Sequence, residues 1–306
     1  MVCEMIRERM NLGVAADLQA LPLAGGITNR NHLILVDGER RWVARQAGVR
    51  TEELGIDRAV EHASAVRAAE LGFGAPVVAW WPEVKVMVSE FGEGIALCPK
   101  TAVEGGTLKC IVEALRNFHQ SPGLGGRFIT GEVVADYVAK SVRAGVELPQ
   151  EVELALKVLQ RIESALFGRV ERMGLAPCHN DLLPGNFLRG LEGDWVWLLD
   201  WEYAGMGDRF FDLGNLAVNL EFDDAACEKL VELYCGEGAT EADLAHLHLM
   251  RLCSDLRESM WGFLQAGISD LEEDFMGYGN KHLRRFLHHA EDARFNSWLE
   301  KVEITL

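Results

Sequence analysis

The sequence predicts an α+β fold of two lobes: a small antiparallel-β lobe with one linking helix at residues 1–93, and a larger, mostly helical lobe at residues 94–306. Three observations support this fold class. A length of 306 residues suggests about two domains or lobes. Strand patterns and a hairpin signal fill the N-terminal third. Past Gly92 and Gly94, apolar residues recur at helical spacing, so a glycine-containing connector separates the two patterns.

The small lobe begins with a hairpin signal. Two apolar stretches, 32–36 and 41–45, flank Asp37 and Gly38, and both turn residues tolerate the positive φ that a tight hairpin requires. A helix that Gly72 ends, and two further strands, are expected next. They lie at residues 57–71, 77–79 and 84–89.

The large lobe is predicted to be helical with one interruption. Five apolar residues share one helical face, at Leu108, Ile111, Val112, Leu115 and Phe118. Further amphipathic helices are expected at 150–173 and 225–265. Between these helices, residues 177–212 form a short island without helical periodicity. A cleft between two such lobes is a common place for a ligand.

The chain is acidic, and its charge is uneven. Asp and Glu outnumber Lys and Arg by 47 to 30, which gives a formal net charge of −17 and a pI of about 5.0. This excludes a general nucleic-acid or anionic-membrane binder, because phosphate groups select for Lys and Arg. Residues 212–274 hold 15 acidic and 3 basic residues, a net charge of −12. Either this segment is a solvated surface, or its field attracts a cationic ligand.

The cysteines and the apolar segments indicate a cytoplasmic protein. The seven cysteines are scattered without a C-x-x-C pair, which supports neither a zinc ribbon nor a thioredoxin motif. Free thiols in a reducing compartment are expected instead. The N-terminus lacks the apolar region of a signal peptide, and no apolar stretch is long enough to predict a membrane span.

The island contains an ordered set of residues suited to phosphoryl transfer. Residues 178–187 read CHNDLLPGNF, in which Asp181 and Asn186 have the H-x-D-x-x-x-x-N spacing of a kinase catalytic loop. The apolar strand 195–199 then leads to Asp200. A carboxylate on a rigid loop can orient a hydroxyl and take its proton, and Asn and Asp oxygens suit Mg²⁺. Each residue alone also fits a turn or a cap, but the ordered set favours catalysis.

These segments resemble the choline/ethanolamine kinase family, which belongs to the wider aminoglycoside phosphotransferase group with its protein-kinase-like fold. The resemblance covers most of the chain and implies a bacterial-type small-molecule kinase. The most specific segments are HNDLLPGN at 179–186, LDWEY at 199–203 and FDLGN at 211–215. Further matches are GGITNRN at 25–31, which resembles the phosphate loop, LRNFH at 115–119 and WG at 261–262.

The resemblance assigns roles to individual residues. It implies that Asp181 is the catalytic base and that Asn186 and Asp200 are the Mg²⁺ ligands. Residue Glu61, on the linking helix, would pair with the cation that contacts the phosphates, and His179 would support the loop. The cofactors implied are ATP and Mg²⁺, with ATP contacts from Thr28, Asn29, Arg45, Glu61, Glu90 and Phe91. In this resemblance, the backbone of residues 90–92 holds the adenine.

The small lobe departs from the protein-kinase pattern in its cation. The first lysine of the chain is Lys85, so the third strand carries no lysine. Arg45, at the end of the strand 41–45, is the expected substitute and resembles the arginine of the choline kinase branch. Arginine keeps the charge and can bind phosphate through two N–H groups.

The acceptor is the least determined part of the prediction. Aromatic faces and carboxylates recognise a quaternary ammonium, and by the resemblance Trp261 and Tyr278 occupy cage positions, although helix packing would explain both equally well. Residues 261–264 read WGFL, whereas the resemblance to eukaryotic choline kinases implies W-G-x-W at this place. The second tryptophan is missing, so ethanolamine or another amino alcohol remains an alternative acceptor. Glu202 and Asp212 either present negative charge to this substrate or anchor loops.

The predicted function is transfer of the γ-phosphate of ATP to the hydroxyl of a small cationic alcohol, choline or ethanolamine first. One alternative is an aminoglycoside, thiamine or sugar kinase of the same fold. The other is a catalytically silent nucleotide- or ligand-binding module. The expected partner is a small-molecule substrate, without nucleic acid or a membrane span, and the protein is expected to be a monomer or a homodimer.

Overall fold

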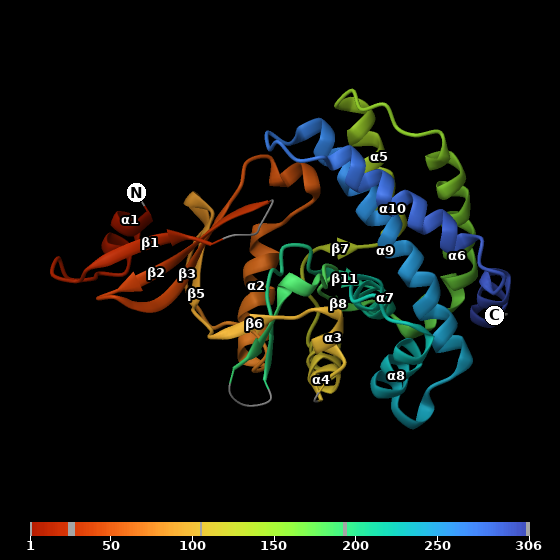
Figure 1. The fold of residues 1–306 in the computed structure, drawn as a ribbon, viewed down its shortest axis with the longest axis horizontal. Helices are drawn as coiled ribbons and strands as arrows, with labels where there is room; N and C mark the ends of the chain where they lie inside the picture. The colour runs from red at the N-terminus through yellow and green to blue at the C-terminus, as the bar shows by residue number, and fades with distance from the viewer. Residues whose placement is uncertain (1, 24–27, 105, 192–194, 304–306) are drawn as a thin grey trace.

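The computed structural model describes residues 2–23, 28–104, 106–191 and 195–303. Figure 1 shows a sheet-rich part near the N-terminus and a larger helical part that contains the C-terminus. This arrangement confirms the predicted α+β class with two unequal lobes. The lobe boundary expected at residue 93 falls between β5 and β6, and it stays a prediction.

A five-stranded antiparallel sheet forms the small lobe. Its order is β1 (Leu18–Pro22), β2 (Asn29–Val36), β3 (Glu39–Ala47), β5 (Val86–Glu90) and β4 (Val77–Trp81). Between β2 and β3, Asp37 and Gly38 have φ values of 53° and 83°, as the hairpin signal predicted. A small apolar core that includes Ile34, Val88 and Ile6 of α1 (Val2–Arg9) lies against this sheet.

Helix α2 (Arg58–Glu70) links the lobes. Asp57 caps it by accepting hydrogen bonds from the N–H groups of Ala59 and Val60 at 2.9 and 3.2 Å. Its residues Ala65 and Ala68 belong to the core of the large lobe, so the helix is packed on that lobe although it precedes β4 in sequence. Two short 3-10 helices, η1 (Thr51–Leu54) and η2 (Pro82–Val84), complete this region.

Two small sheets position the site between the lobes. In the first, β6 (Gly94–Ala96) pairs with β9 (Phe187–Gly190), which pairs with β10 (Val196–Leu198). In the second, β11 (Gly205–Gly207) lies between β7 (Arg127–Phe128) and β8 (Ala176–Cys178). The connector thus lies against the strand that follows the catalytic loop, and that loop includes the 3-10 helix η3 (Pro184–Asn186).

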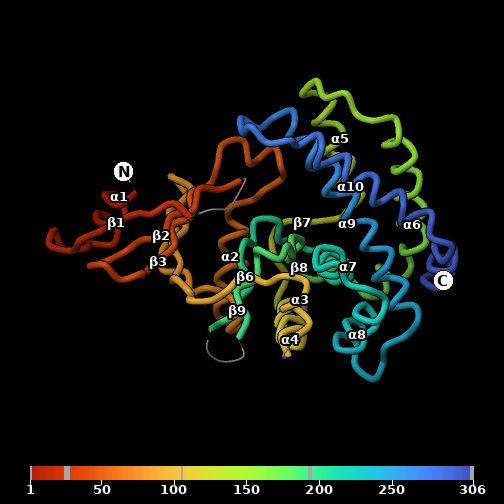
Figure 2. Tube along the Cα trace, viewed as in Figure 1, coloured from red at the N-terminus to blue at the C-terminus, as the bar shows by residue number. Residues whose placement is uncertain are grey.

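The long helix α9 (Glu241–Ile268) organises the large lobe. It packs against α5 (Thr130–Arg143), α7 (Arg209–Asn219), α10 (Phe275–Ala290) and α11 (Phe295–Val302), and Figure 2 shows α9 and α10 side by side. The remaining helices are α3 (Pro99–Ala102), α4 (Thr107–His119), α6 (Glu151–Met173), α8 (Asp224–Cys235) and η4 (Gly236–Gly238). No helix in the described ranges is long and apolar enough to cross a membrane.

The helix predictions for this lobe are correct in position but not in every boundary. Helices α4 and α6 match the expected ranges. The helical stretch predicted at 225–265 consists of two helices, because Gly236 takes a φ of 68° and ends α8. The non-helical island is shorter than predicted, since α7 already begins at Arg209, where Asp208 caps it.

Candidate active site

Asp212, in the first turn of α7, anchors the loop between β8 and β9. Its carboxylate is fully enclosed, with 0% of the residue exposed. Oδ1 accepts the N–H of Asn180 at 2.7 Å, and Oδ2 accepts the N–H of His179 and Nε2–H of His119, both at 2.9 Å. Burial alone would raise the pKa of Asp212, but the hydrogen bond and charge of His119 and the contacts of His179 hold it below its usual value. Of its two open roles, the structure supports the loop anchor and not the substrate contact.

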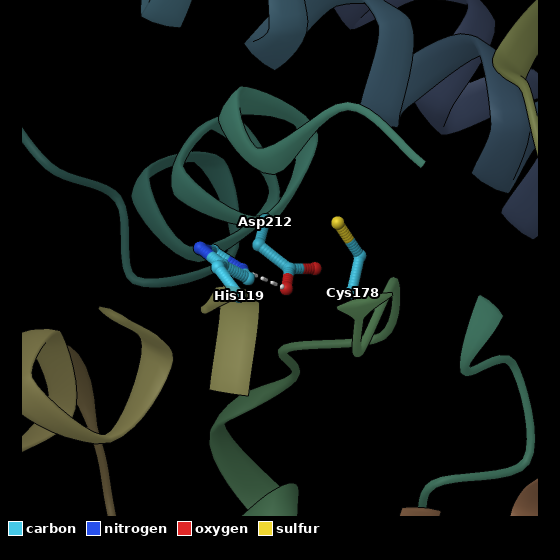
Figure 3. A group of neighbouring side chains, drawn as sticks. All are labelled: His119, Cys178 and Asp212. Atoms are coloured by element: carbon cyan, nitrogen blue, oxygen red, sulfur yellow. Dashed lines mark hydrogen bonds and ion pairs between the residues drawn. The ribbon is translucent and has the colours of Figure 1, made fainter. Parts of the chain in front are cut away.

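Cys178 lies beside this anchor, and Figure 3 shows the three side chains together. Both ring nitrogens of His119 are engaged, because Nδ1 lies 2.7 Å from the hydroxyl of Tyr234 and Nε2 bonds to Asp212. Burial raises the pKa of the Cys178 thiol well above its usual value, and the thiol donates to the carbonyl of Ala176. A metal ion would require a thiolate and a free imidazole nitrogen. We therefore interpret the group as structural support for the loop.

His179 supports the loop from inside, as expected. Its Nε2–H donates to the carbonyl of Leu199 at 2.9 Å, and its Nδ1 accepts the N–H of Asp181 at 3.2 Å. Burial lowers the pKa of His179, which keeps the imidazole neutral and able to do both. The ring also packs on Trp201.

Two non-glycine residues of the site have a left-handed backbone. Asn180 and Asp200 have φ values of 66° and 65°. Such a conformation costs on the order of 1 kcal/mol or more and persists where the surroundings impose it. At Asn180 the carbonyl accepts Nη2–H of Arg257 at 2.6 Å, and the side-chain amide donates to the carbonyl of Tyr203 at 3.0 Å. The strained backbone therefore lies directly before the predicted base Asp181 and at the predicted metal ligand Asp200.

The carboxylate of Asp181 is buried and held from two directions. Arg257 Nη2 donates to its Oδ1, and Asn186 Nδ2 donates to its Oδ2, each at 3.1 Å. Burial raises the pKa of Asp181 to about 7; Arg257 opposes this shift, while Glu258 and Asp200 add to it. A carboxylate with such a pKa can accept a proton near neutral pH.

Asn186 and Asp200, the predicted metal ligands, are brought together by the backbone. The N–H of Leu199 donates to the carbonyl of Asn186 at 2.8 Å, which fixes the start of the Asp200 turn next to the catalytic loop. Because Nδ2 of Asn186 faces Asp181, its Oδ1 is left without a hydrogen bond from any residue that the structure describes. An oxygen donor set of this kind fits Mg²⁺.

A cluster of two arginines and three carboxylates joins the lobes. Arg45 Nε lies 3.2 Å from Glu61 Oε1, which is the pair expected from the sequence, and its Nη2 pairs with Asp200 and lies 3.3 Å from Glu202. Arg58 Nη1 lies 2.6 Å from Glu61 and 3.2 Å from Glu202. In the described part of the chain, Nε and Nη2 of Arg58 are buried without a hydrogen-bond partner, so this arginine can also hold an anion.

Glu202 faces the small lobe rather than an acceptor. Its Oε1 accepts the hydroxyl of Thr28 at 2.6 Å and its Oε2 accepts Nδ2–H of Asn29 at 2.8 Å. Burial raises the pKa of Glu202 to about 7, with Asp200 adding to the shift and Arg45 opposing it. Of its two open roles, the structure supports the anchor, here between the lobes. The ATP contacts of Thr28 and Asn29 stay a prediction, and the preceding residues 24–27 lie outside the described residues.

The connector after β5 lies close to β9 and β10. The N–H groups of Glu90 and Phe91 donate to the carbonyls of Pro76 and Arg41 at 2.8 and 3.0 Å, which fixes the backbone expected to hold adenine. A Cβ at Gly92 would overlap the ring of Trp197, so this position has room only for glycine. The adenine contact itself stays a prediction.

An aromatic wall lies on the other side of the catalytic loop. Trp261 of α9 and Tyr278 of α10 pack at a centroid distance of 5.6 Å and an interplanar angle of 67°. Trp261 Nε1–H donates to the hydroxyl of Tyr203, and the hydroxyl of Tyr278 donates to Glu258 Oε2, both at 2.8 Å. Arg257 Nη1 lies 3.0 Å from Glu258 Oε1 and so joins this wall to the catalytic loop. Both predicted cage aromatics are therefore close to the site.

The acidic residues of the segment 212–274 fall into a large exposed group and a small buried group. Eleven of its 15 acidic residues are exposed and Asp243 is half-buried, so most of the segment is a solvated surface. Three are buried: Asp212 in the loop anchor, Asp255 beside His282 and Arg285, and Glu258 next to the aromatic wall. Of the acidic residues in this segment, Glu258 is therefore the buried one that is placed to attract a cationic ligand to the aromatic wall.

The sequence prediction assigned no role to four residues of the site: Arg58, Tyr203, Arg257 and Glu258. A signal existed for the last two, because they interrupt the apolar run LCSDLRESMWGFL at 252–264, and charged residues on an otherwise apolar helix need partners. Both are almost fully buried. Their partners are up to 77 positions away in sequence, so spacing could not identify them.

A comparison with protein families gives a match that follows from these motifs. The sequence model of the phosphotransferase enzyme family matches residues 19–247, which is well over half of the chain. The chain belongs to this family. The matched range includes the small-lobe sheet, the connector, the catalytic loop and the strand that leads to Asp200. The family resemblance inferred from the sequence is confirmed.

The chain is also similar to individual members of this family, over different shares of its length. The chain is 28% identical to a choline/ethanolamine kinase family protein from Mesorhizobium loti, whose crystal structure matches with a TM-score of 0.81 over 100% of both chains. It is 25% identical over 284 residues to a probable ethanolamine kinase of Arabidopsis thaliana, covering 84% of this chain and 75% of that protein. It is 32% identical to protein LicA of Haemophilus influenzae over 132 residues, 40% of this chain and 46% of LicA. The chain thus spans less than half of the length of LicA.

Proposed function

We propose that the protein transfers the terminal phosphate of ATP to the hydroxyl of a small cationic alcohol, with choline and ethanolamine as first candidates. One observation carries this proposal: Asp181 is a buried carboxylate with a pKa of about 7 that is bonded to Asn186 on one side. On the other side, it is joined through Arg257 to Glu258 and the aromatic wall. The carboxylate thus adjoins both an oxygen donor set and a candidate cation site.

In this proposal the residues divide the work of phosphoryl transfer. Asp181 orients the acceptor hydroxyl and takes its proton. Arg45 and Arg58 bind the phosphates, and the backbone of residues 90–92 holds the adenine. Asn186 and Asp200 would hold Mg²⁺, which when bound neutralises charge on the phosphates.

The acceptor follows from the charges on the aromatic wall. A polycationic aminoglycoside requires several carboxylates, whereas Glu258 is the one buried acid of the segment 212–274 that lies next to this wall. One carboxylate beside Trp261, Tyr278 and Tyr203 suits one ammonium group. At the position of the missing second tryptophan, Leu264 is 0% exposed, so that position faces the core. The name of the Arabidopsis relative supports the same acceptor class.

An acceptor panel tests the proposal. The purified protein is incubated with Mg-ATP and one of choline, ethanolamine, thiamine, kanamycin or glucose, and ADP release is measured. We expect release with choline or ethanolamine, none with Asp181→Asn, and unchanged release with Asp270→Asn, a control at an exposed carboxylate. Release with only thiamine, kanamycin or glucose would establish the alternative kinase. Binding of Mg-ATP without release for any acceptor would indicate a silent binding module.

A further inference from the structure

A cavity of about 400 Å³ lies in the large lobe, apart from the candidate active site. It is open to solvent on one side and is lined by residues of β7 and of helices α5, α6, α7 and α9 or adjacent to them. None of Asp181, Asn186, Asp200, Glu202 or Trp261 lines it. Its volume is in the range of pockets that enclose small molecules, about 300–1,000 Å³.

The walls of this cavity are mostly apolar. Helix α6 contributes Ile162, Leu166 and Val170, and Met250 of α9 lies among the remaining lining residues. Phe167, also a lining residue, is 61% exposed, although it is one of the largest apolar side chains of α6. An apolar molecule in the cavity would remove such surface from water, which is favourable.

The charges around the cavity favour a positive group. Glu163 is exposed to solvent and lines the cavity; its Oε1 accepts the N–H of Gly131 at 3.0 Å, while its Oε2 has no hydrogen bond from any residue in the described ranges. A Cβ at Gly131 would overlap this carboxylate in its present position, so the glycine leaves room for the contact. Glu171 lines the cavity and is exposed. The one lining arginine, Arg127, is already paired with Glu132 at 3.1 Å.

Two lining residues also contact the groups that hold the catalytic loop. The ring of Phe128 lies 6.0 Å from the guanidinium carbon of Arg257 and 5.1 Å from the ring of Phe211. Phe211 precedes Asp212, which accepts the loop N–H groups. A molecule in the cavity would therefore pack against the supports of the loop.

We propose that this cavity binds an amphipathic amine, an apolar chain or ring with one positive charge, and that the bound amine tightens the packing beneath the catalytic loop. The apolar part lies among the side chains of α6 and α9. The ammonium group pairs with Glu163, whose Oε2 is available. The site is separate from the acceptor site, and its binding does not depend on the protein being a kinase.

Calorimetric titration of the full-length protein at pH 8 tests the binding. Three probes of equal chain length are compared: n-octylamine, n-octanol and octanoate. We expect octylamine to bind most tightly, octanol more weakly and octanoate not at all. Glu163→Gln should weaken octylamine about two- to fivefold, as expected for loss of an exposed ion pair. Glu151→Gln, at an exposed position of the same helix, should leave it unchanged.

A second variant and a second readout complete the test. Phe167→Lys, at an exposed position, should weaken octylamine and allow octanoate to bind. Octylamine at a concentration close to the wild-type Kd should slow hydrogen exchange of the His179 and Asn180 amides in the wild type, and should slow it less in Glu163→Gln. Equal affinity for octanoate and octylamine, or no effect of Glu163→Gln, would overturn the site. Unchanged exchange at both amides with octylamine bound would overturn its link to the loop.

Discussion

The buried carboxylate of Asp181 makes the stability of this protein depend on pH, and the variant Asp181→Asn isolates that dependence. In the folded protein the pKa of Asp181 is raised from 3.8 to about 7, chiefly by burial. Between these two pH values the folded state keeps the proton and the unfolded state does not. The free energy of unfolding therefore falls as pH rises, and the loss is complete above about pH 7.

The size of the effect follows from the shift in pKa. One unit corresponds to about 1.4 kcal/mol, so a shift of about three units sets an upper bound near 4 kcal/mol. Asparagine keeps the shape of the side chain but cannot ionise. It also changes the net charge of the buried trio Asp181, Arg257 and Glu258 from −1 to zero. We expect Asp181→Asn to gain about 2–4 kcal/mol relative to the wild type between pH 4.5 and pH 8.

Urea unfolding at several pH values in this range measures the gain. The pKa of Glu202 is also raised to about 7, but Glu202 is present in both proteins, so its contribution cancels in the difference. Asp270→Asn, at an exposed carboxylate, serves as the control and should show a constant difference from the wild type. A difference for Asp181→Asn that stays constant within about 1 kcal/mol, or that decreases with pH, would refute the electrostatic account of this site.

Three further predictions follow from the contacts around the site. Asp212→Ala should lower the free energy of unfolding by about 3–5 kcal/mol in urea, because it leaves buried N–H groups and His119 without their partner; a loss below about 1 kcal/mol would contradict its role as the loop anchor. Gly92→Ala should raise the KM for ATP and leave the KM for the acceptor unchanged, since its methyl group overlaps Trp197 in the connector; equal changes in both constants would count against a nucleotide site there. Trp261→Leu should raise the KM for the acceptor about tenfold at constant KM for ATP, in line with about 1–2 kcal/mol for a cation on an aromatic face; an unchanged acceptor KM would assign Trp261 to helix packing alone.

Elements with a strong local signal could be predicted from the sequence. The turn at Asp37 and Gly38 depends on the backbone preferences of two residues, and it occurs as expected. The catalytic loop could be predicted for a different reason, since the spacing of Asp181 and Asn186 reflects one rigid loop. In each case the information lies within about ten residues.

Contacts between distant segments could not be predicted. Glu202 follows Asp200 closely in sequence, where an acceptor contact and a loop anchor were equally compatible with it, and its oxygens bind Thr28 and Asn29 of the small lobe. Arg257 approaches Asp181 because α9 passes beneath the loop, and no local pattern contains that crossing. The pairing of β6 with β9 likewise joins segments far apart in the chain.

The central claim is that Asp181 serves phosphoryl transfer from ATP to a small cationic alcohol. Phosphorus NMR of the complete reaction tests it most directly, because it identifies both the product and its source. With Mg-ATP and choline or ethanolamine, the wild type is expected to give a phosphomonoester of the acceptor and an equal amount of ADP. Asp181→Asn, folded and stable, should give neither above a rate about 10²–10⁴-fold lower. Inorganic phosphate without a phosphorylated acceptor, or an Asp181→Asn variant with the wild-type rate, would contradict the account.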